Sequence, residues 1–424
     1  MGNILNRREF LGTTAAITAG LSMGAKASSA DKELTVGVVG MGRGRSLAQT
    51  FAASSGCVVK YVCDTDSKRL EAGAADVGKV SGKAPQTVGD FRRILDDAEV
   101  DAMVFALPVH WHAPAAIMAC NAGKHVYVEK PCCHNPAEGE LLVAAARKYN
   151  RCVQMGTQRR SSEVLQEAIE KLHGGSIGRC YFARSWYASL RDSIGQGQAA
   201  AVPPNLDYDM WQGPAPRRPY KDNLVHYNWH WHWHWGTGEL GNNGTHVLDL
   251  CRWGLQVSYP TKVTAAGGRY RYKDDQETPD THAVTYEFGD DMTVTWEGLS
   301  CNQPGSGGNN FGATFYGEGG SLTVGSTNYS IRDNQGKVLE EKKGDLGGKE
   351  HVDNFLNAIR EETPMSLNAE IERGYKSTLL SHLGNIAYRT GHTLECDAAG
   401  HIKNDPEAAA LWQRAYEAGW APKV

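Results

Sequence analysis

The sequence lacks most of the features that mark a specialised class of protein. Its 44 Lys and Arg residues nearly balance 48 Asp and Glu, so the net charge is −4 and neither half of the chain is basic. Nucleic acid is therefore not an expected partner, because phosphate binding needs a clustered positive surface. No apolar run approaches the roughly 18 residues of a membrane span. We also find no internal repeat. The length of 424 residues predicts a globular protein of two to three domains.

The ten cysteines show no regular spacing, and several of them fall in apolar segments. A disulfide framework would require paired cysteines at characteristic separations. Buried free thiols are therefore expected instead.

Residues 1–30 are typical of a twin-arginine export signal. Arg7 and Arg8 precede a weakly hydrophobic stretch and then small residues, with possible cleavage after Ala27 or Ala30. An ordinary amphipathic helix is the alternative. Because the twin-arginine route carries folded proteins, a chain that acquires a dinucleotide in the cytoplasm would suit it. We therefore predict a periplasmic or otherwise exported protein.

Residues 31–157 alternate short β-rich runs with helical runs. Strands are expected over 34–39, 58–63, 102–106, 125–128 and 152–156, and helices over 46–51, 67–76, 91–96, 114–122 and 136–149. This alternation predicts a parallel, doubly wound sheet, that is, an N-terminal Rossmann dinucleotide-binding domain.

From about residue 178 the pattern changes to longer β-runs separated by Gly, Asp and Asn turns. The runs cover 180–187, 262–272, 281–288, 292–297, 313–316 and 321–324, and helices follow over 351–360 and 370–387. We predict an α/β fold in which residues 158–424 form a second domain with a large, mostly antiparallel open sheet. Its C-terminal helices are expected to pack back on the Rossmann domain.

A glycine-rich turn lies directly between the first predicted strand and its helix. Gly40 makes the turn, Gly42 allows the backbone to approach a pyrophosphate, and the helix N-terminus supplies positive potential. Gly44 stands one position early, because Arg45 occupies the place of the usual third glycine. The context of strand, turn and helix is the one that this motif requires.

The acidic residue that accompanies such a turn is Asp64, at the end of the second predicted strand. A carboxylate there accepts hydrogen bonds from ribose hydroxyls and repels a 2′-phosphate. NAD is therefore favoured over NADP. Arg43 or Arg45 could still bind a phosphate, so NADP stays open.

Several stretches together resemble the Gfo/Idh/MocA oxidoreductase family, named after glucose–fructose oxidoreductase, inositol dehydrogenase and a rhizopine-catabolism protein. They are 106–112 (ALPVHWH), 122–131 (AGKHVYVEKP), 156–160 (GTQRR), 241–253 (GNNGTHVLDLCRW) and 381–385 (SHLGN). The resemblance implies NAD(P)-dependent oxidation or reduction of sugars, polyols and their derivatives. It also implies a C-terminal domain whose open sheet often forms the oligomer interface, so a homo-oligomer is expected.

The catalytic candidates are Lys130 and His246. Lys130 follows a strand at the carboxyl edge of the sheet, where its ammonium can orient a substrate hydroxyl and desolvation can lower its pKa. In relatives that oxidise polyols, the later motif carries Asp-x-x-x-His on one helix. Here the pair is Asn242 and His246, and asparagine has no proton to exchange.

The remaining cofactor residues follow from the turn and the resemblance, whereas the substrate residues come mainly from the first β-run of the second domain and from the Trp-His run described next. The expected cofactor-binding residues are Gly40, Gly42, Arg43, Gly44, Asp64, Pro108, Trp111, His112, Glu129, Lys130 and Gln158. His112 is expected beside the nicotinamide, and Trp111 either on the ring or in the core. The expected substrate residues are Tyr187, Arg191, His230, Trp233 and Asn242.

Residues 229–235 alternate Trp and His without interruption. If this run is extended, three histidines share one face and four tryptophans the other. Three imidazoles could hold Zn²⁺, but no carboxylate stands nearby to support them, and we predict no metal. A carbohydrate platform is the favoured interpretation. The alternative is that the tryptophans fill an interdomain core.

These features predict a secreted NAD(P)-dependent oxidoreductase. Hydride passes between a ring hydroxyl of a sugar or glycoside, with C3 as one candidate, and a tightly bound nicotinamide cofactor. Free NAD is scarce outside the cytoplasm, so a second sugar is expected to recycle the cofactor. An NAD-dependent glycosidase that works by transient oxidation and elimination is one alternative. A non-catalytic sugar-binding protein, suggested by Asn242, is the other.

Overall fold

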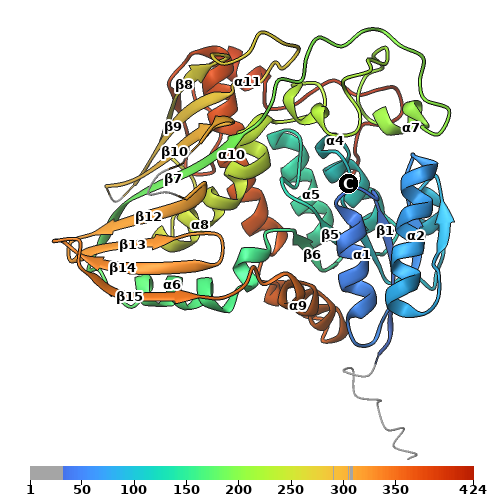
Figure 1. Cartoon of the computed structure of the whole chain (residues 1–424), viewed down its shortest axis with the longest axis horizontal. Helices are drawn as coiled ribbons and strands as arrows, with labels where there is room; N and C mark the ends of the chain where they lie inside the picture. Colours follow the sequence, from blue (N-terminus) through green and yellow to red (C-terminus); the bar gives the residue numbers. More distant parts are fainter. Residues whose placement is uncertain (1–31, 290, 304, 306–308) are drawn as a thin grey trace, which may run out of the picture.

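The computed structural model describes residues 32–289, 291–303, 305 and 309–424. The described chain forms two α/β domains that lie side by side (Figure 1). The predicted export signal falls outside the described residues. Within the described ranges, no helix combines the length and the apolar composition that a membrane crossing requires.

The first domain is built on a parallel sheet of six strands. Its strands are β1 (Leu34–Val39), β2 (Cys57–Cys63), β3 (Gln86–Val88), β4 (Ala102–Phe105), β5 (His125–Val128) and β6 (Val153–Met155), in the order β3-β2-β1-β4-β5-β6. All five pairings are parallel. The chain leaves β1 toward one side of the sheet and returns to β4 on the other. The crevice between the carboxyl ends of β1 and β4 is therefore the expected ligand position.

Helices cover both faces of this sheet. They are α1 (Gly44–Ala53), α2 (Ser67–Ser81), α3 (Arg92–Leu95), α4 (Val109–Asn121) and α5 (Pro136–Lys148). Because both faces are covered, the central strands are apolar along their whole length, and all four residues of β4 are buried. The predicted Rossmann domain is confirmed.

The second domain carries a sheet of ten strands. They are β7 (Cys180–Leu190), β8 (Lys262–Gly268), β9 (Thr281–Phe288), β10 (Met292–Leu299), β11 (Cys301–Asn302), β12 (Phe311–Gly317), β13 (Gly320–Val324), β14 (Asn328–Asp333), β15 (Val338–Lys343) and β16 (Leu394–Glu395). The order is β15-β14-β13-β12-β7-β10-β9-β8-β16, with β11 beside β7. Of the described pairings only β7 with β10 is parallel, so the prediction of a mostly antiparallel sheet is confirmed.

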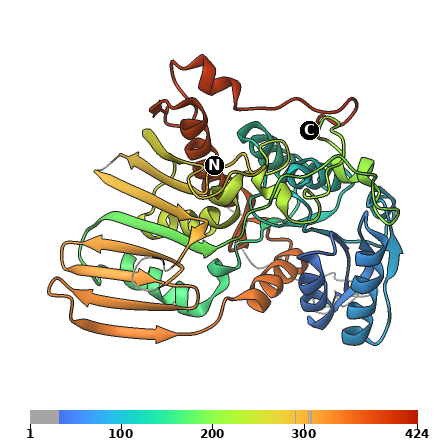
Figure 2. The ribbon, with the colours of Figure 1, turned by 45° about the horizontal axis from the view of Figure 1, so that its top comes forward.

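Helices pack on one face of the large sheet, as Figures 1 and 2 show. They are α6 (Glu163–His173), α8 (Thr245–Leu255) and α10 (Ile371–Thr390). Helix α10 also contacts α5 and β6, and α9 (Gly348–Arg360) contacts α1. Phe355 of α9 packs edge-on against Phe51 and Tyr127 of the Rossmann domain.

Some elements differ from the expectation. The helix expected over 114–122 begins at Val109, so Pro114 lies inside it. The expected start followed from the preference of proline for the first turn of a helix, but residues 109–113 are also helical and buried. Strands β14 and β15 were not expected. Strand β15 has no apolar signal, because it is polar and largely exposed. The strand expected over 262–272 ends at Gly268.

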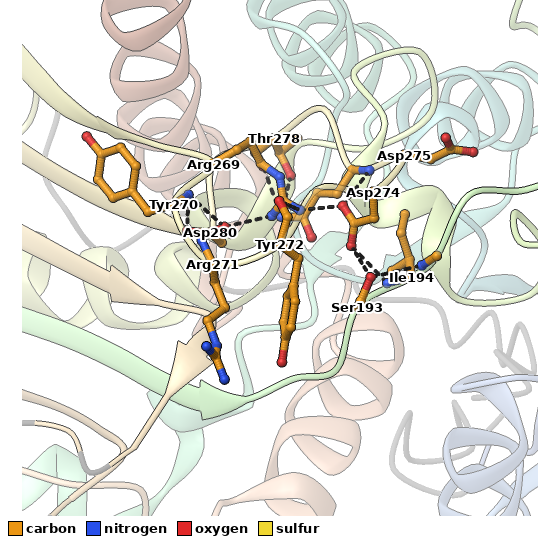
Figure 3. A network of polar contacts seen from close by, with 12 residues as sticks. Ser193, Ile194, Arg269, Tyr270, Arg271, Tyr272, Asp274, Asp275, Thr278 and Asp280 are labelled. Atoms are coloured by element: carbon orange, nitrogen blue, oxygen red, sulfur yellow. Dashed lines mark hydrogen bonds and ion pairs between the residues drawn. The ribbon is translucent and has the colours of Figure 1, made fainter.

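The early end of β8 has a visible cause. The carboxylate of Asp280 accepts hydrogen bonds from the backbone N–H groups of Tyr270 and Arg271 and forms an ion pair of 2.9 Å with Arg269. Arg269 also pairs with Asp274, whose carboxylate accepts hydrogen bonds from Ser193 Oγ (2.7 Å) and Ile194 N (3.0 Å) (Figure 3). These bonds replace strand pairing after Gly268 with a loop tied to the chain that follows β7.

Candidate active site

The predicted dinucleotide turn is present between β1 and α1. Gly40 has a φ of +92°, and a Cβ there would lie 2.4 Å from the carbonyl oxygen of Ala106. A Cβ on Gly42 would lie 2.9 Å from a guanidinium nitrogen of Arg69. Gly40 therefore needs glycine, both for its backbone conformation and for space, whereas a Cβ at Gly42 would only displace the end of the Arg69 side chain. Gly44 is buried in the first turn of α1 against Ala106.

The carboxylate of Asp64 fixes this turn. One of its oxygens accepts a hydrogen bond from Met41 N (2.6 Å) and the other from Asp66 N (2.8 Å). Burial raises the pKa of Asp64, and the two backbone donors oppose that effect. Asp64 thus lies where predicted, with part of its hydrogen-bonding capacity already used by the protein.

A cavity of about 430 Å³ opens beside this turn, and we call it the Lys130 cavity. The predicted site residues that line it are Gly40, Gly42, Arg43, Asp64, Pro108, Trp111, His112, Glu129, Lys130, His230 and Asn242. Trp229 of the Trp-His run also lines it, and the lining residues that the sequence reasoning missed are Thr65, Arg69, Ala106, Leu107, Trp211, His226 and Tyr227. The structure thus brings residues of both domains to the crevice that the strand order predicts.

Lys130 is held at the inner end of the cavity by the second domain. Its Nζ donates to the backbone oxygen (2.7 Å) and the side-chain Oδ1 (3.1 Å) of Asn242. Burial lowers the pKa of Lys130, while Glu129 and Glu239 oppose that shift. Glu129 itself accepts a hydrogen bond from Lys130 N (3.2 Å) and lies 3.4 Å from Arg43 Nε. Lys130 is therefore oriented, and its neutral form is more accessible than that of an exposed lysine.

His246 lies just beyond Asn242, at the start of α8 after a π-helical turn over Leu240–Gly244. Its side chain is 8% exposed and is not among the lining residues of the cavity. Burial, and next the charges of Arg159 and Lys130, hold the pKa of His246 well below its usual value. In the described part of the chain its Nδ1 has no hydrogen-bond partner. The imidazole of His246 is therefore neutral near neutral pH.

His112 and Trp111 belong to the wall of the cavity. The ring nitrogens of His112 lie 2.6 Å from the carbonyl oxygen of Pro131 and 2.7 Å from that of Leu107, which joins the loops after β4 and β5. Trp111 donates its indole N–H to Trp211 O (3.0 Å) and is 3% exposed. Trp111 is therefore a core residue with one edge at the cavity.

The Trp-His run is not extended, so its histidines and tryptophans do not separate onto two opposite faces. Residues Asn228–Trp231 form a 3-10 helix, and turns follow. Trp229 and His230 stack with ring centroids 3.6 Å apart and line the Lys130 cavity. Trp233 and His234 line a second cavity. His232 and Trp235 line a third. Among the described residues, no group of three His, Cys, Asp or Glu is placed to hold a metal ion.

Other predicted residues lie outside the cavity. Arg191 pairs with Glu239 (2.8 Å), and its guanidinium lies 3.4 Å from the hydroxyl of Tyr187, so both residues brace the chain after β7. Gln158 is in a short 3-10 helix after β6 and does not line the cavity. Arg45 forms an ion pair with Asp76 on α2 and does not line the cavity.

The segment 191–235, which we call the strap, crosses from the second domain to the Rossmann domain. In Figures 1 and 2 it is the light green chain that runs beside α4 and α2. Asn205 and His226 both bond to Oδ2 of Asp66, at 2.7 and 2.9 Å. Backbone bonds join Ser67 N to Asn205 O and Asp207 N to Thr65 O, each at 2.9 Å. The strap therefore closes the Lys130 cavity beside Asp64.

Two family models cover nearly all of the described chain. Residues 34–157 match an oxidoreductase family domain described as an NAD-binding Rossmann fold, and residues 192–422 match the C-terminal alpha/beta domain of the same family. The second match alone covers more than half of the chain.

Individual curated relatives share less than a third of their residues with this chain over the matched regions. A glycosyl hydrolase family 109 protein of Saccharopolyspora erythraea is 29% identical over 212 residues, which are 44% of this chain and 46% of the relative. A levoglucosan dehydrogenase of Pseudarthrobacter phenanthrenivorans is 26% identical over 230 residues, 52% and 51% of the two chains. The matched region thus spans about half the length of these curated relatives.

A solved structure shares the architecture of most of the chain. A levoglucosan dehydrogenase in complex with NADH and levoglucosan superposes with a TM-score of 0.67 and 19% identity, covering 85% of this chain and 99% of that one. At this identity the likeness shows the fold. The fold and the two family matches together show that the chain belongs to the Gfo/Idh/MocA oxidoreductase family.

Proposed function

We propose that the protein is an NAD(P)-dependent oxidoreductase that acts on a ring hydroxyl of a sugar or glycoside, with a tightly held cofactor. The observation that carries the proposal is the placement of Lys130. Its Nζ lies in the same cavity as the glycine turn and is fixed by Asn242 of the other domain. A base is thus available beside a dinucleotide cradle.

The residues present fit a dinucleotide. Gly40 and Gly42 line the cavity without side chains, so backbone alone faces the space beside the turn. Arg69 and Arg43 line the cavity on the side of this turn and can neutralise phosphate charge, while Asp64 can accept bonds from ribose hydroxyls. A bound nicotinamide would supply the hydride acceptor for the carbon that bears the hydroxyl.

The protein's own contribution is to handle the hydroxyl proton. The neutral amine of Lys130 accepts that proton, and Asn242 holds the amine in place through two oxygens. His246, kept neutral by burial, is the second candidate base. A positioned base of this kind contributes about 10²–10⁴-fold to turnover.

The strap supports retention of the cofactor between turnovers. Its contacts with Asp66 would have to open before a dinucleotide beside Asp64 could leave. His226→Ala is expected to speed up the loss of bound dinucleotide about tenfold, since hydrogen bonds to charged groups contribute about 1.5–3 kcal/mol. His401→Ala, which breaks an exposed contact with Glu140 elsewhere, is the control. Equal dinucleotide loss from both variants after dialysis would contradict this role.

The proposal has four finer parts. They are export through the twin-arginine route, recycling of the retained cofactor by a second sugar, oxidation at C3, and a homo-oligomer through the large sheet. The first rests on Arg7 and Arg8. The second follows from the first, because free NAD is scarce outside the cytoplasm.

An NAD-dependent glycosidase is the second candidate, because one relative is a glycosyl hydrolase family 109 protein. In such an enzyme transient oxidation acidifies a neighbouring C–H, the aglycone is eliminated and water is added. Cleavage of a nitrophenyl glycoside without any added electron acceptor would favour this candidate.

The test is mass spectrometry of the nucleotide extracted from dialysed protein, followed by absorbance at the reduced-nicotinamide band across a panel of sugars. We expect about one NAD or NADP per chain and reduction by at least one sugar. A bound nucleotide that no sugar reduces, with no glycoside cleavage, would favour a sugar-binding protein instead.

A further inference from the structure

A second cavity, of about 290 Å³, lies apart from the Lys130 cavity and shares no lining residue with it. It is enclosed by the chain before α5, the second half of α10, residues 233–237 and the C-terminal segment 411–415. We call it the Arg389 cavity. The proposed oxidoreductase function does not use it.

The cavity contains a cation that lacks a counter-ion. Arg389, in the last turn of α10, lines it with its guanidinium 5.0 Å from the ring centroid of Trp233. Within the described residues, Arg389 makes no side-chain hydrogen bond and no ion pair. Partial burial lowers its pKa, and Glu277 opposes that shift. Arg389 is exposed, so its N–H donors are open to an acceptor or an anion that enters the cavity.

The neighbouring groups do not balance this charge. Glu138 is used by Arg414, whose guanidinium lies 2.9 Å from it, and by the hydroxyl of Tyr416 at 3.0 Å. Glu277 accepts a hydrogen bond from Trp233 N (2.8 Å) and lies beyond ion-pair distance of Arg389. The unbalanced charge of the cavity is therefore positive.

The three histidines that line the cavity add no charge near neutral pH. Burial lowers the pKa of His234 and of His382 to about 4 and holds that of His134 well below its usual value. The rest of the lining includes the amide of Gln413 and the apolar side chains of Ile386 and Leu411.

We propose that the Arg389 cavity binds the carboxylate of a monosaccharide-sized sugar acid. The planar guanidinium fork matches a carboxylate with two parallel hydrogen bonds. A volume of about 290 Å³ is at the small end of the range for small-molecule sites, which suits a single sugar ring. Gln413 can bond ring hydroxyls, while Ile386 and Leu411 can contact C–H groups.

Isothermal titration of the purified, cofactor-loaded protein with D-glucuronate tests this site. We expect saturable binding at one site per chain, and little binding of D-glucose, which has no carboxylate. Arg389→Gln should weaken glucuronate binding about tenfold or more, because a charge-assisted bond is lost. Arg389→Lys, which keeps the charge but not the fork, should weaken it less. Arg271→Gln removes an exposed guanidinium elsewhere and should leave binding unchanged.

Lys130→Met distinguishes this site from the Lys130 cavity and should bind glucuronate as the parent does. The absence of saturable binding by the parent would overturn the proposal. So would equal affinities for the parent, Arg389→Gln and Arg389→Lys, or binding that is lost in Lys130→Met but kept in Arg389→Gln. Tighter binding of inorganic phosphate than of glucuronate would overturn the assignment to a carboxylate.

Discussion

Replacing Asn242 by Asp places a carboxylate next to the proposed base. Asn242 Oδ1 lies 3.1 Å from Lys130 Nζ, and two unit charges at that distance interact by about 5 kcal/mol at an effective dielectric constant of about 20. Because Lys130 is only partly buried, we expect solvent to screen part of this and about 1.4–4 kcal/mol to remain. That energy strengthens the affinity of Lys130 for its proton about 10- to 1000-fold and raises its pKa. Asn242→Ala removes an acceptor of the charged amine and should lower that pKa instead.

The assay is the pH dependence of kcat/KM on a sugar that the parent oxidises. Lys130 acts as a base in its neutral form, so activity falls as the pH drops below its pKa. Asn242→Asp should move the acidic limb to higher pH and lower kcat/KM on that limb by the same factor as the gain in proton affinity, while Asn242→Ala moves the limb the other way. An acidic limb that stays in place in both variants, or moves down in Asn242→Asp, would refute the assignment of Lys130 as the base.

Three further predictions concern the cofactor, the catalytic groups and export. Asp64→Ala should lower the amount of NAD that co-purifies and relax discrimination against NADP, because the ribose acceptor is lost while Arg69 remains; unchanged content and selectivity would contradict this. Lys130→Met and His246→Ala should each lower kcat by about 10²–10⁴-fold with the cofactor still bound; near-normal turnover in both places the base elsewhere. Replacing Arg7 and Arg8 by Lys should leave loaded protein in the cytoplasm, and normal export of that variant would exclude the twin-arginine route.

The regular part of the fold could be predicted because its signals are local. Strands β5 and β9 have the predicted bounds, since apolar β-rich runs end at clear turn residues. Gly40 and Asp64 could also be placed, because a turn after one strand and an acid after the next share one sheet edge by topology. The polar strand β15 gives no such signal and was missed.

The walls of the site could not be predicted, because they depend on contacts between distant segments. His226 reaches Asp66 across 160 residues, and no periodicity in the strap indicates that contact. The Trp-His run shows the opposite case, in which a strong local pattern is overridden. Its alternation suggests a strand, but the run begins in the 3-10 helix Asn228–Trp231, where Trp229 stacks on His230. Farther along, Trp235 packs against Trp211.

The central claim is that the protein carries its own nicotinamide and that Lys130 removes the hydroxyl proton from a sugar. A single-turnover experiment tests it most directly: dialysed protein is mixed with a sugar, with no second acceptor present, and absorbance at the reduced-nicotinamide band is followed. We predict reduction of about one bound nicotinamide per chain, slowed by about 10²–10⁴-fold in Lys130→Met at equal cofactor content. The same rate in the parent and in Lys130→Met, or the absence of bound nicotinamide from the parent, would contradict the account.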